Sequence, residues 1–166
     1  MRPPFDPPTS ADVAEVSRQL GRPARDVVGI AARCVCGRPT VVSTRPRLGD
    51  GTPFPTFYYL SHPAATAAVS TLEAEGRMPA FAAHLVGEAA TAYRAAHESY
   101  LADRALYGVV EEVEGISAGG MPDRVKCLHA LVAHSLAAGP GVNPIGDLAL
   151  AEADWSPEVC ACAPVA

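Results

Sequence analysis

The sequence predicts an α+β fold in which a small antiparallel sheet is covered by a layer of helices. Segments rich in β-branched and aromatic residues gather early in the chain, at 27–33, 40–44 and 56–60. The later part is dominated by alanine-rich segments in which apolar residues recur at helical spacing. Because the strands precede the helices instead of alternating with them, we expect about three antiparallel strands and about five helices packed against them.

The first helix and the three strands are predicted from the residues that begin, end and connect them. Thr9 or Ser10 caps a first short helix that Gly21 ends. The strands at 27–33 and 40–44 are joined by a tight turn, Cys34-Val35-Cys36-Gly37-Arg38-Pro39. A loop follows, in which Asp50-Gly51 favours a turn and nearby prolines favour an extended exit. The third strand, 56–60, leads directly into Ser61-His62-Pro63.

The later elements are predicted to be helical. Three helices are expected at 64–75, 79–86 and 88–106, followed by a segment at 109–116 that is either a short strand or an irregular connector. Pro122 and Asp123 are typical of a helix start, so the next helix is placed between Ser117 and Ala138, with Gly139 ending it. A short helix at 145–153 closes the fold.

The amino-acid composition and net charge limit which classes of protein the chain can belong to. The chain has 166 residues, of which 49% are hydrophobic and 19% charged, as in one globular domain. We expect that domain at 10–153, between a flexible proline-rich arm at 1–9 and a flexible tail at 154–166. A net charge of −5 favours neither nucleic acid nor an anionic membrane as partner. Without a long apolar run or a secretory signal, a cytoplasmic location is expected.

The cysteines point to metal or thiol chemistry. Their number, five, is odd, and their spacing is not that of a disulfide scaffold, which favours a reducing compartment. The Cys34-x-Cys36 pair has one intervening residue, whereas a usual zinc knuckle has two. One alternative is an all-cysteine site that combines this pair with Cys160 and Cys162.

The predicted helix at 117–138 carries further candidates. At about 100° per residue, Cys127 and His134 lie within about 20° of each other on one flank of its apolar face, and His129 lies on the other flank. Cys127 and His134 are also about 10 Å apart along the axis, so we expect only one of them to bind a given metal ion directly.

Four segments of the sequence together carry a resemblance to a known family. They are Arg33-Cys34-Val35-Cys36-Gly37-Arg38-Pro39, the stretch from Asp50 to Pro63, Leu72-Glu73-Ala74-Glu75-Gly76, and Val125-Lys126-Cys127-Leu128-His129. The chain resembles the bacterial domain-of-unknown-function family 501 over about 27–147. In actinobacteria, members are typically encoded near a septum-formation initiator and an exopolyphosphatase, so the resemblance implies a protein partner linked to cell division.

The resemblance also implies a set of metal ligands. Family members commonly have Thr-Cys-Pro where this chain has Ser61-His62-Pro63, and zinc accepts cysteine and histidine alike. The implied ligands are therefore Cys34, His62 and Cys127. The fourth is left open between Cys36, His134, His129 and water.

Two classes of function follow. The first, which we favour because no general base is placed convincingly, is a cytoplasmic zinc-binding domain with a structural or interaction role. The second is a metal-dependent hydrolase-type enzyme acting on an anionic small molecule, with His129 or His134 transferring protons. In that enzyme the anionic group would be held by Gly119, Gly120, Arg124 and Lys126. A metal-free variant would use Cys127 as nucleophile and His134 as base. An iron–sulfur protein is a further alternative, with ligands Cys34, Cys127 and either His62 or Cys36.

Overall fold

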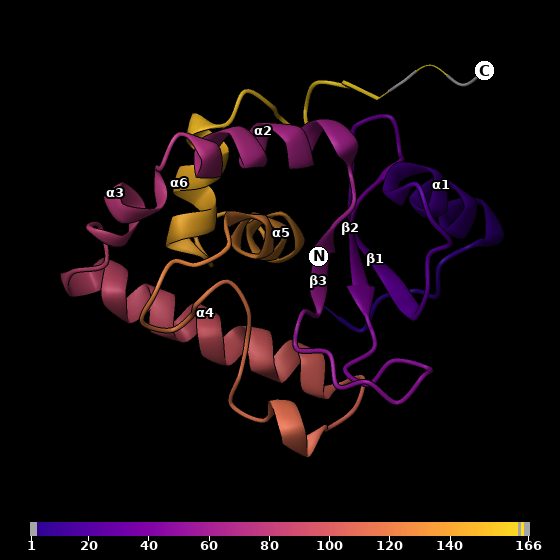
Figure 1. The fold of residues 1–166 in the computed structure, drawn as a ribbon, viewed down its shortest axis with the longest axis horizontal. Coiled ribbons are helices and arrows are strands. Elements are labelled where there is room, and N and C mark those ends of the chain that lie inside the picture. The colour runs from indigo at the N-terminus through magenta and orange to yellow at the C-terminus, as the bar shows by residue number, and fades with distance from the viewer. Residues whose placement is uncertain (1–2, 163, 165–166) are drawn as a thin grey trace.

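The chain forms a three-stranded antiparallel sheet packed between helices, which confirms the predicted α+β class (Figure 1). The structure, a computed structural model, describes residues 3–162 and 164. The strands are β1 (Val27–Arg33), β2 (Pro39–Thr44) and β3 (Tyr58–Leu60), paired in the order β1-β2-β3. The helices are α1 (Ser10–Leu20), α2 (Pro63–Ala74), α3 (Met78–Ala82), α4 (Gly87–Ala105), the 3₁₀ turn η1 (Glu111–Val113), α5 (Leu128–Ala138) and α6 (Pro144–Glu152). None of the described helices combines the length and apolarity that a membrane span requires.

Helices pack against both faces of the sheet. On one face, α1 packs through a small cluster of Val16, Ile30 and Val42. On the other face lies α5, seen end-on at the centre of Figure 1, with α2, α4 and α6 around it. Every residue of the central strand β2 is therefore buried.

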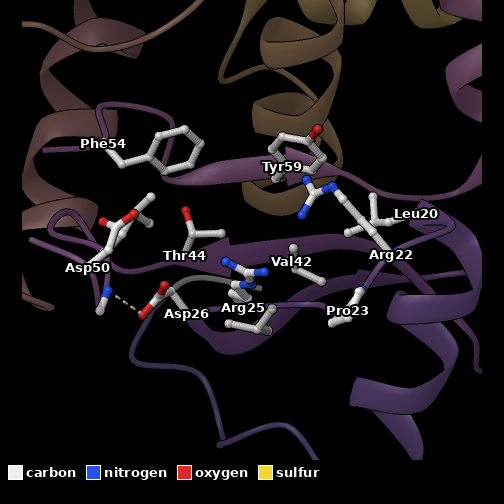
Figure 2. A pocket seen from close by; sticks show the side chains of 13 residues that line it. Leu20, Arg22, Pro23, Arg25, Asp26, Val42, Thr44, Asp50, Phe54 and Tyr59 are labelled. Carbon is white, nitrogen blue, oxygen red and sulfur yellow. Dashed lines mark hydrogen bonds between the residues drawn. The ribbon is translucent and has the colours of Figure 1, made fainter. Parts of the chain in front are cut away.

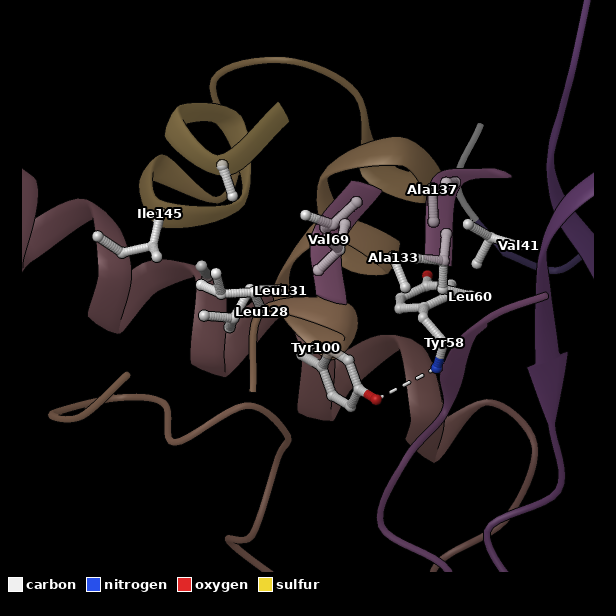
Figure 3. Packing of buried hydrophobic residues seen from close by; sticks show 14 of the residues in the cluster. Val41, Tyr58, Leu60, Val69, Tyr100, Leu128, Leu131, Ala133, Ala137 and Ile145 are labelled. Atoms are coloured by element: carbon white, nitrogen blue, oxygen red, sulfur yellow. Dashed lines mark hydrogen bonds between the residues drawn. The ribbon is translucent and has the colours of Figure 1, made fainter. Parts of the chain in front are cut away.

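The larger core lies between the sheet and the helical layer, and it contains His134. This histidine has no exposed surface and stacks on Tyr58, with ring centroids 5.6 Å apart. Tyr100 meets it edge-on at 5.2 Å. The Tyr100 hydroxyl accepts the backbone N–H groups of Phe57 at 2.6 Å and Tyr58 at 3.2 Å, the second of which Figure 3 shows. His134 thus belongs to the aromatic core between α4, α5 and β3.

Helix α5 begins later than its sequence signals predict. Gly119 and Gly120 have φ angles of 69° and 98°, in the left-handed region that favours glycine. The carbonyl of Gly119 accepts the N–H of Lys126 at 2.7 Å, and that of Gly120 accepts the N–H of Arg124 at 2.9 Å. These bonds fold the segment back on itself instead of starting a helix at Pro122. Cys127 is consequently the N-cap residue of α5.

Two segments predicted to be flexible contribute side chains to the core. Phe5 is only 6% exposed and packs edge-on against Tyr58, while its N–H donates to the hydroxyl of Tyr107 at 2.7 Å. Trp155 is 9% exposed and belongs to the same core cluster. The chain that follows Trp155 therefore starts from an anchored position.

Candidate functional site

Four cysteine sulfurs from the two ends of the chain meet beside the sheet. Cys34 and Cys36 lie in the turn between β1 and β2, and Cys160 and Cys162 come from the C-terminal segment. All four sulfurs lie within 4.8 Å of one another, and those of Cys36 and Cys162 are 3.4 Å apart. Zinc bound tetrahedrally at 2.3 Å separates its ligand sulfurs by about 3.8 Å. The cluster can therefore hold a metal ion.

The turn directs its two thiols by backbone geometry. The N–H of Gly37 donates to the carbonyl of Cys34 at 2.8 Å, and the N–H of Cys34 donates to the carbonyl of Arg38 at 2.8 Å. Gly37 has a φ of 89°, which lets the chain reverse within the Cys-x-Cys-Gly sequence. The C-terminal segment joins this turn through the Val35 N–H, which donates to the carbonyl of Pro157 at 3.1 Å.

Local electrostatics differ among the four thiols. The N–H of Arg38, directed at the sulfur of Cys36, lowers the pKa of that thiol to about 7. Burial raises the pKa of Cys34, which is 3% exposed, and that of Cys162. A cation among the sulfurs would favour the thiolate form of all four, since thiolates are the form that binds metals.

His62 lies against this cluster as a hydrogen-bonding neighbour. It is the N-cap of α2, and its Nδ1 accepts the N–H of Ala65 at 3.4 Å. With Nδ1 as acceptor, the ring proton sits on Nε2, which lies 3.1 Å from the sulfur of Cys162. The His62 ring also packs against the ring of Trp155, with centroids 5.4 Å apart and the planes tilted by 46°. Burial lowers the pKa of His62, so it is neutral and can donate this bond at neutral pH.

A second cluster lies where α2 meets α5. One ligand atom each of Glu73, Cys127 and His129 lie within 4.8 Å of one another. Glu73 is in the last turn of α2, and its Oε1 accepts the N–H of Leu128 at 2.8 Å. The Nδ1 of His129 lies 3.2 Å from the same oxygen. A hydrogen bond between the side chains of Cys127 and His129 lowers the pKa of the thiol and raises the pKa of the imidazole.

The structure distributes the predicted metal ligands over three places. Cys34 and Cys36 are in the four-cysteine cluster, with His62 against it. Cys127 lies in the second cluster instead, and His134 is in the core. The twelve residues of α2 span about 18 Å, with the N-cap His62 before the first of them and Glu73 in the last turn. The late start of α5 leaves Cys127 at the Glu73 end of this helix, away from Cys34. The sequence-based alternative of Cys34, Cys36, Cys160 and Cys162 is the set that comes together.

The predicted anion-binding residues line a shallow hollow of about 360 Å³ beside Pro55 and Thr56. Gly119, Gly120, Arg124 and Lys126 are all in its wall. The backbone N–H groups of Arg124 and Lys126, however, already donate to the glycine carbonyls. Because α5 starts only at Leu128, these residues do not form a helix N-terminus, and the two exposed basic side chains are what the hollow offers an anion.

A larger cleft of about 740 Å³ opens on the α1 face of the sheet, beyond the end of α1 (Figure 2). Val42 and Thr44 of β2 lie at its base, and Tyr59 and Phe54 stand at one side. The guanidinium groups of Arg22 and Arg25 extend over this base (Figure 2), and neither makes an ion pair with another residue that the structure describes. The carboxylates of Asp26 and Asp50 also line the cleft, so its two positive groups are matched by two negative ones.

Sequence reasoning assigns no role to Glu73, Arg22 or Arg25. Glu73 falls within one of the quoted motifs, and an acidic residue there was the available signal for the second cluster. Arg22 and Arg25 carry no such signal, because their common position over the sheet depends on where α1 ends.

Comparison with known proteins gives one match. The family model described as "Protein of unknown function (DUF501)" matches residues 30–151. Neither the curated proteins nor the solved structures contain a match to the chain. The matched range includes the whole second cluster together with Cys34, Cys36 and His62, but Cys160 and Cys162 lie beyond it.

Proposed function

The chain belongs to the DUF501 family, whose function is not known, and from that premise we propose that it is a small zinc-binding module in which the ion has a structural role. The proposed ligands are the thiolates of Cys34, Cys36, Cys160 and Cys162. The observation that carries this proposal is the convergence of their four sulfurs within 4.8 Å, although Cys36 and Cys162 are 126 positions apart in the sequence. Free thiols used as ligands also fit a reducing compartment such as the cytoplasm.

The geometry favours one ion over an iron–sulfur cluster. Four sulfurs at mutual distances below 4.8 Å surround a space that one tetrahedral ion fills with bonds of about 2.3 Å. A cluster of several irons would hold its cysteine sulfurs farther apart, because inorganic sulfide lies between the metals. Zinc, which readily binds four thiolates in tetrahedral geometry, is therefore the proposed metal.

The ligand number supports a structural role. Four protein ligands complete the tetrahedron and leave no position for water or substrate, as in structural zinc sites generally. Several neighbours suit the resulting negative charge. The Nε2–H of His62 faces Cys162, and the Arg38 N–H faces Cys36. The charge of Arg18 also interacts favourably with Cys162. The ion would fasten the C-terminal segment onto the β1–β2 turn.

The single tryptophan gives a direct test, because Trp155 sits between the core and the segment that carries Cys160 and Cys162. Protein purified without a histidine tag should contain zinc. Cys36→Ser should lower the zinc content by one equivalent and shift the emission of Trp155 to longer wavelength, as a strong chelator should do in the wild type. Cys127→Ser makes the same chemical change outside the cluster and should leave the Trp155 emission and its response to chelator unchanged.

Two outcomes would overturn the proposal. Zinc content that is equal in wild type and Cys36→Ser, with Trp155 emission insensitive to chelator, would remove the four-cysteine site. Coloured protein that contains iron and inorganic sulfide would replace zinc by an iron–sulfur cluster. An absorption spectrum and metal analysis on the same sample separate these results.

A further inference from the structure

The junction of α2 and α5 brings three different metal-binding groups to one point near the surface. Glu73 supplies a carboxylate, Cys127 a thiol and His129 an imidazole, with one ligand atom of each within 4.8 Å of the others. All three side chains are half-buried, so the point they share is reachable from solvent. As N-cap, Cys127 has extended backbone angles, whereas His129 is already helical. This change of direction lets two side chains only two positions apart converge.

The contacts of His129 show which ring nitrogen faces the shared point. Its Nε2 lies 3.3 Å from the backbone carbonyl oxygen of Thr66 and 3.0 Å from the hydroxyl of Ser70. In one tautomer Nε2 carries the ring proton and donates it to the Thr66 carbonyl, which only accepts hydrogen bonds. In the neutral ring, Nδ1 then presents a lone pair to the carboxylate oxygen of Glu73, 3.2 Å away. In this tautomer a positive charge between the two acceptors would stabilise the pair, whereas in the other tautomer Nδ1–H donates to Glu73 and the Ser70 hydroxyl donates to Nε2.

The carboxylate of Glu73 is also held in place by a hydrogen bond. Oε1 of Glu73 accepts the backbone N–H of Leu128 at 2.8 Å, which fixes it against the first turn of α5. A histidine whose second ring nitrogen is held by a carbonyl, and a carboxylate that is itself hydrogen-bonded, are the surroundings in which metal ligands are usually found. The positive charge can be a proton on His129 or a metal cation bound by all three groups.

We propose that Glu73, Cys127 and His129 bind a second zinc ion, through one oxygen, one sulfur and one nitrogen, with a fourth position left to water. Three protein ligands of mixed type near the surface are the pattern of zinc sites that keep an exchangeable position, in contrast to the closed four-cysteine site. The open position is suited to water or a small anion, and zinc there would acidify the bound water. This inference goes beyond the structural role proposed above and does not depend on it.

The test uses full-length protein in which the first site has been disabled by Cys160→Ser and Cys162→Ser. Both positions lie outside the second cluster and outside the matched family range. Cobalt(II) is the probe, since its thiolate charge-transfer absorption reports a Co–S bond. We expect one equivalent of cobalt to bind with this absorption and to be displaced by zinc. Glu73→Gln in this background should weaken cobalt binding at least tenfold.

Glu75→Gln is the matched control, because Glu75 is exposed just beyond the end of α2 and outside the cluster. It should bind cobalt as its parent does. If Glu73→Gln does not fold, Cys127→Ser serves instead and should lose the charge-transfer absorption while its circular dichroism is retained. Folded parent protein that binds no cobalt, or binds it equally with Glu73→Gln, overturns the proposal. Fast alkylation of Cys127 by iodoacetamide in metal-free parent, with no cobalt bound, would assign the charge to a proton on His129.

Discussion

Replacing Gly37 with alanine tests the contribution of the β1–β2 turn to the proposed zinc binding. Gly37 has a φ of 89°, and a Cβ added there would meet no atom within 4 Å, so the substitution adds backbone strain without a steric clash. An L-residue in the left-handed region costs about 1–2 kcal/mol. The exposed metal-free turn can relax this strain, whereas the metal-bound turn must hold Cys34 and Cys36 in place. Zinc affinity should therefore fall by about 5- to 30-fold.

Gly51 supplies a closely matched control. Its φ is also 89° and its added Cβ would also meet nothing within 4 Å, but it lies in the loop between β2 and β3, away from the cysteines. Zinc affinity can be measured by competition with a chromophoric chelator for wild type, Gly37→Ala and Gly51→Ala. We expect Gly51→Ala to match wild type. Equal affinities for Gly37→Ala and wild type, or equal losses in both variants, would show that the turn does not position the ligands.

Two further predictions concern the framework around the sites. Tyr100→Phe removes the acceptor of two buried backbone N–H groups, so the unfolding free energy in urea should fall by about 2–4 kcal/mol. Tyr59→Phe, in the wall of the cleft, should change it by less than about 0.5 kcal/mol, and a similar loss in both would contradict this explanation. Arg33 holds the pKa of the Asp12 carboxyl well below its usual range. The resulting stability is present above about pH 4, the unfolded pKa, and is lost as the pH falls further. Because Arg33 is partly exposed, Asp12→Asn should cost only about 1 kcal/mol at pH 7. That difference should shrink at pH 3 in urea titrations, and a constant difference would refute the assignment.

Local sequence signals were sufficient for most of the framework. β-Branched and aromatic residues predicted the three strands, and Gly21, Gly76 and Gly139 mark chain positions where helices end or have just ended. These signals act over a few residues, so they can be recognised without knowing the rest of the fold. The start of α5 was mispredicted because a local signal did not decide the structure there. Pro122 carries a helix-start signal, but the carbonyls of Gly119 and Gly120 bind the following N–H groups and hold the segment in turns.

Residue types alone indicated metal chemistry, but they did not determine which side chains meet. The sequence by itself identified the cysteines and histidines as candidate ligands, and the four-cysteine set was among its alternatives. Tertiary structure decided that Cys34 and Cys36 meet the C-terminal cysteines, that Cys127 meets Glu73 and His129, and that His134 lies in the core. The physical reason is that these meetings depend on how α2 packs on α5 and on where Trp155 anchors the C-terminal segment. Such packing between distant segments produces no pattern that can be recognised in a short stretch of sequence.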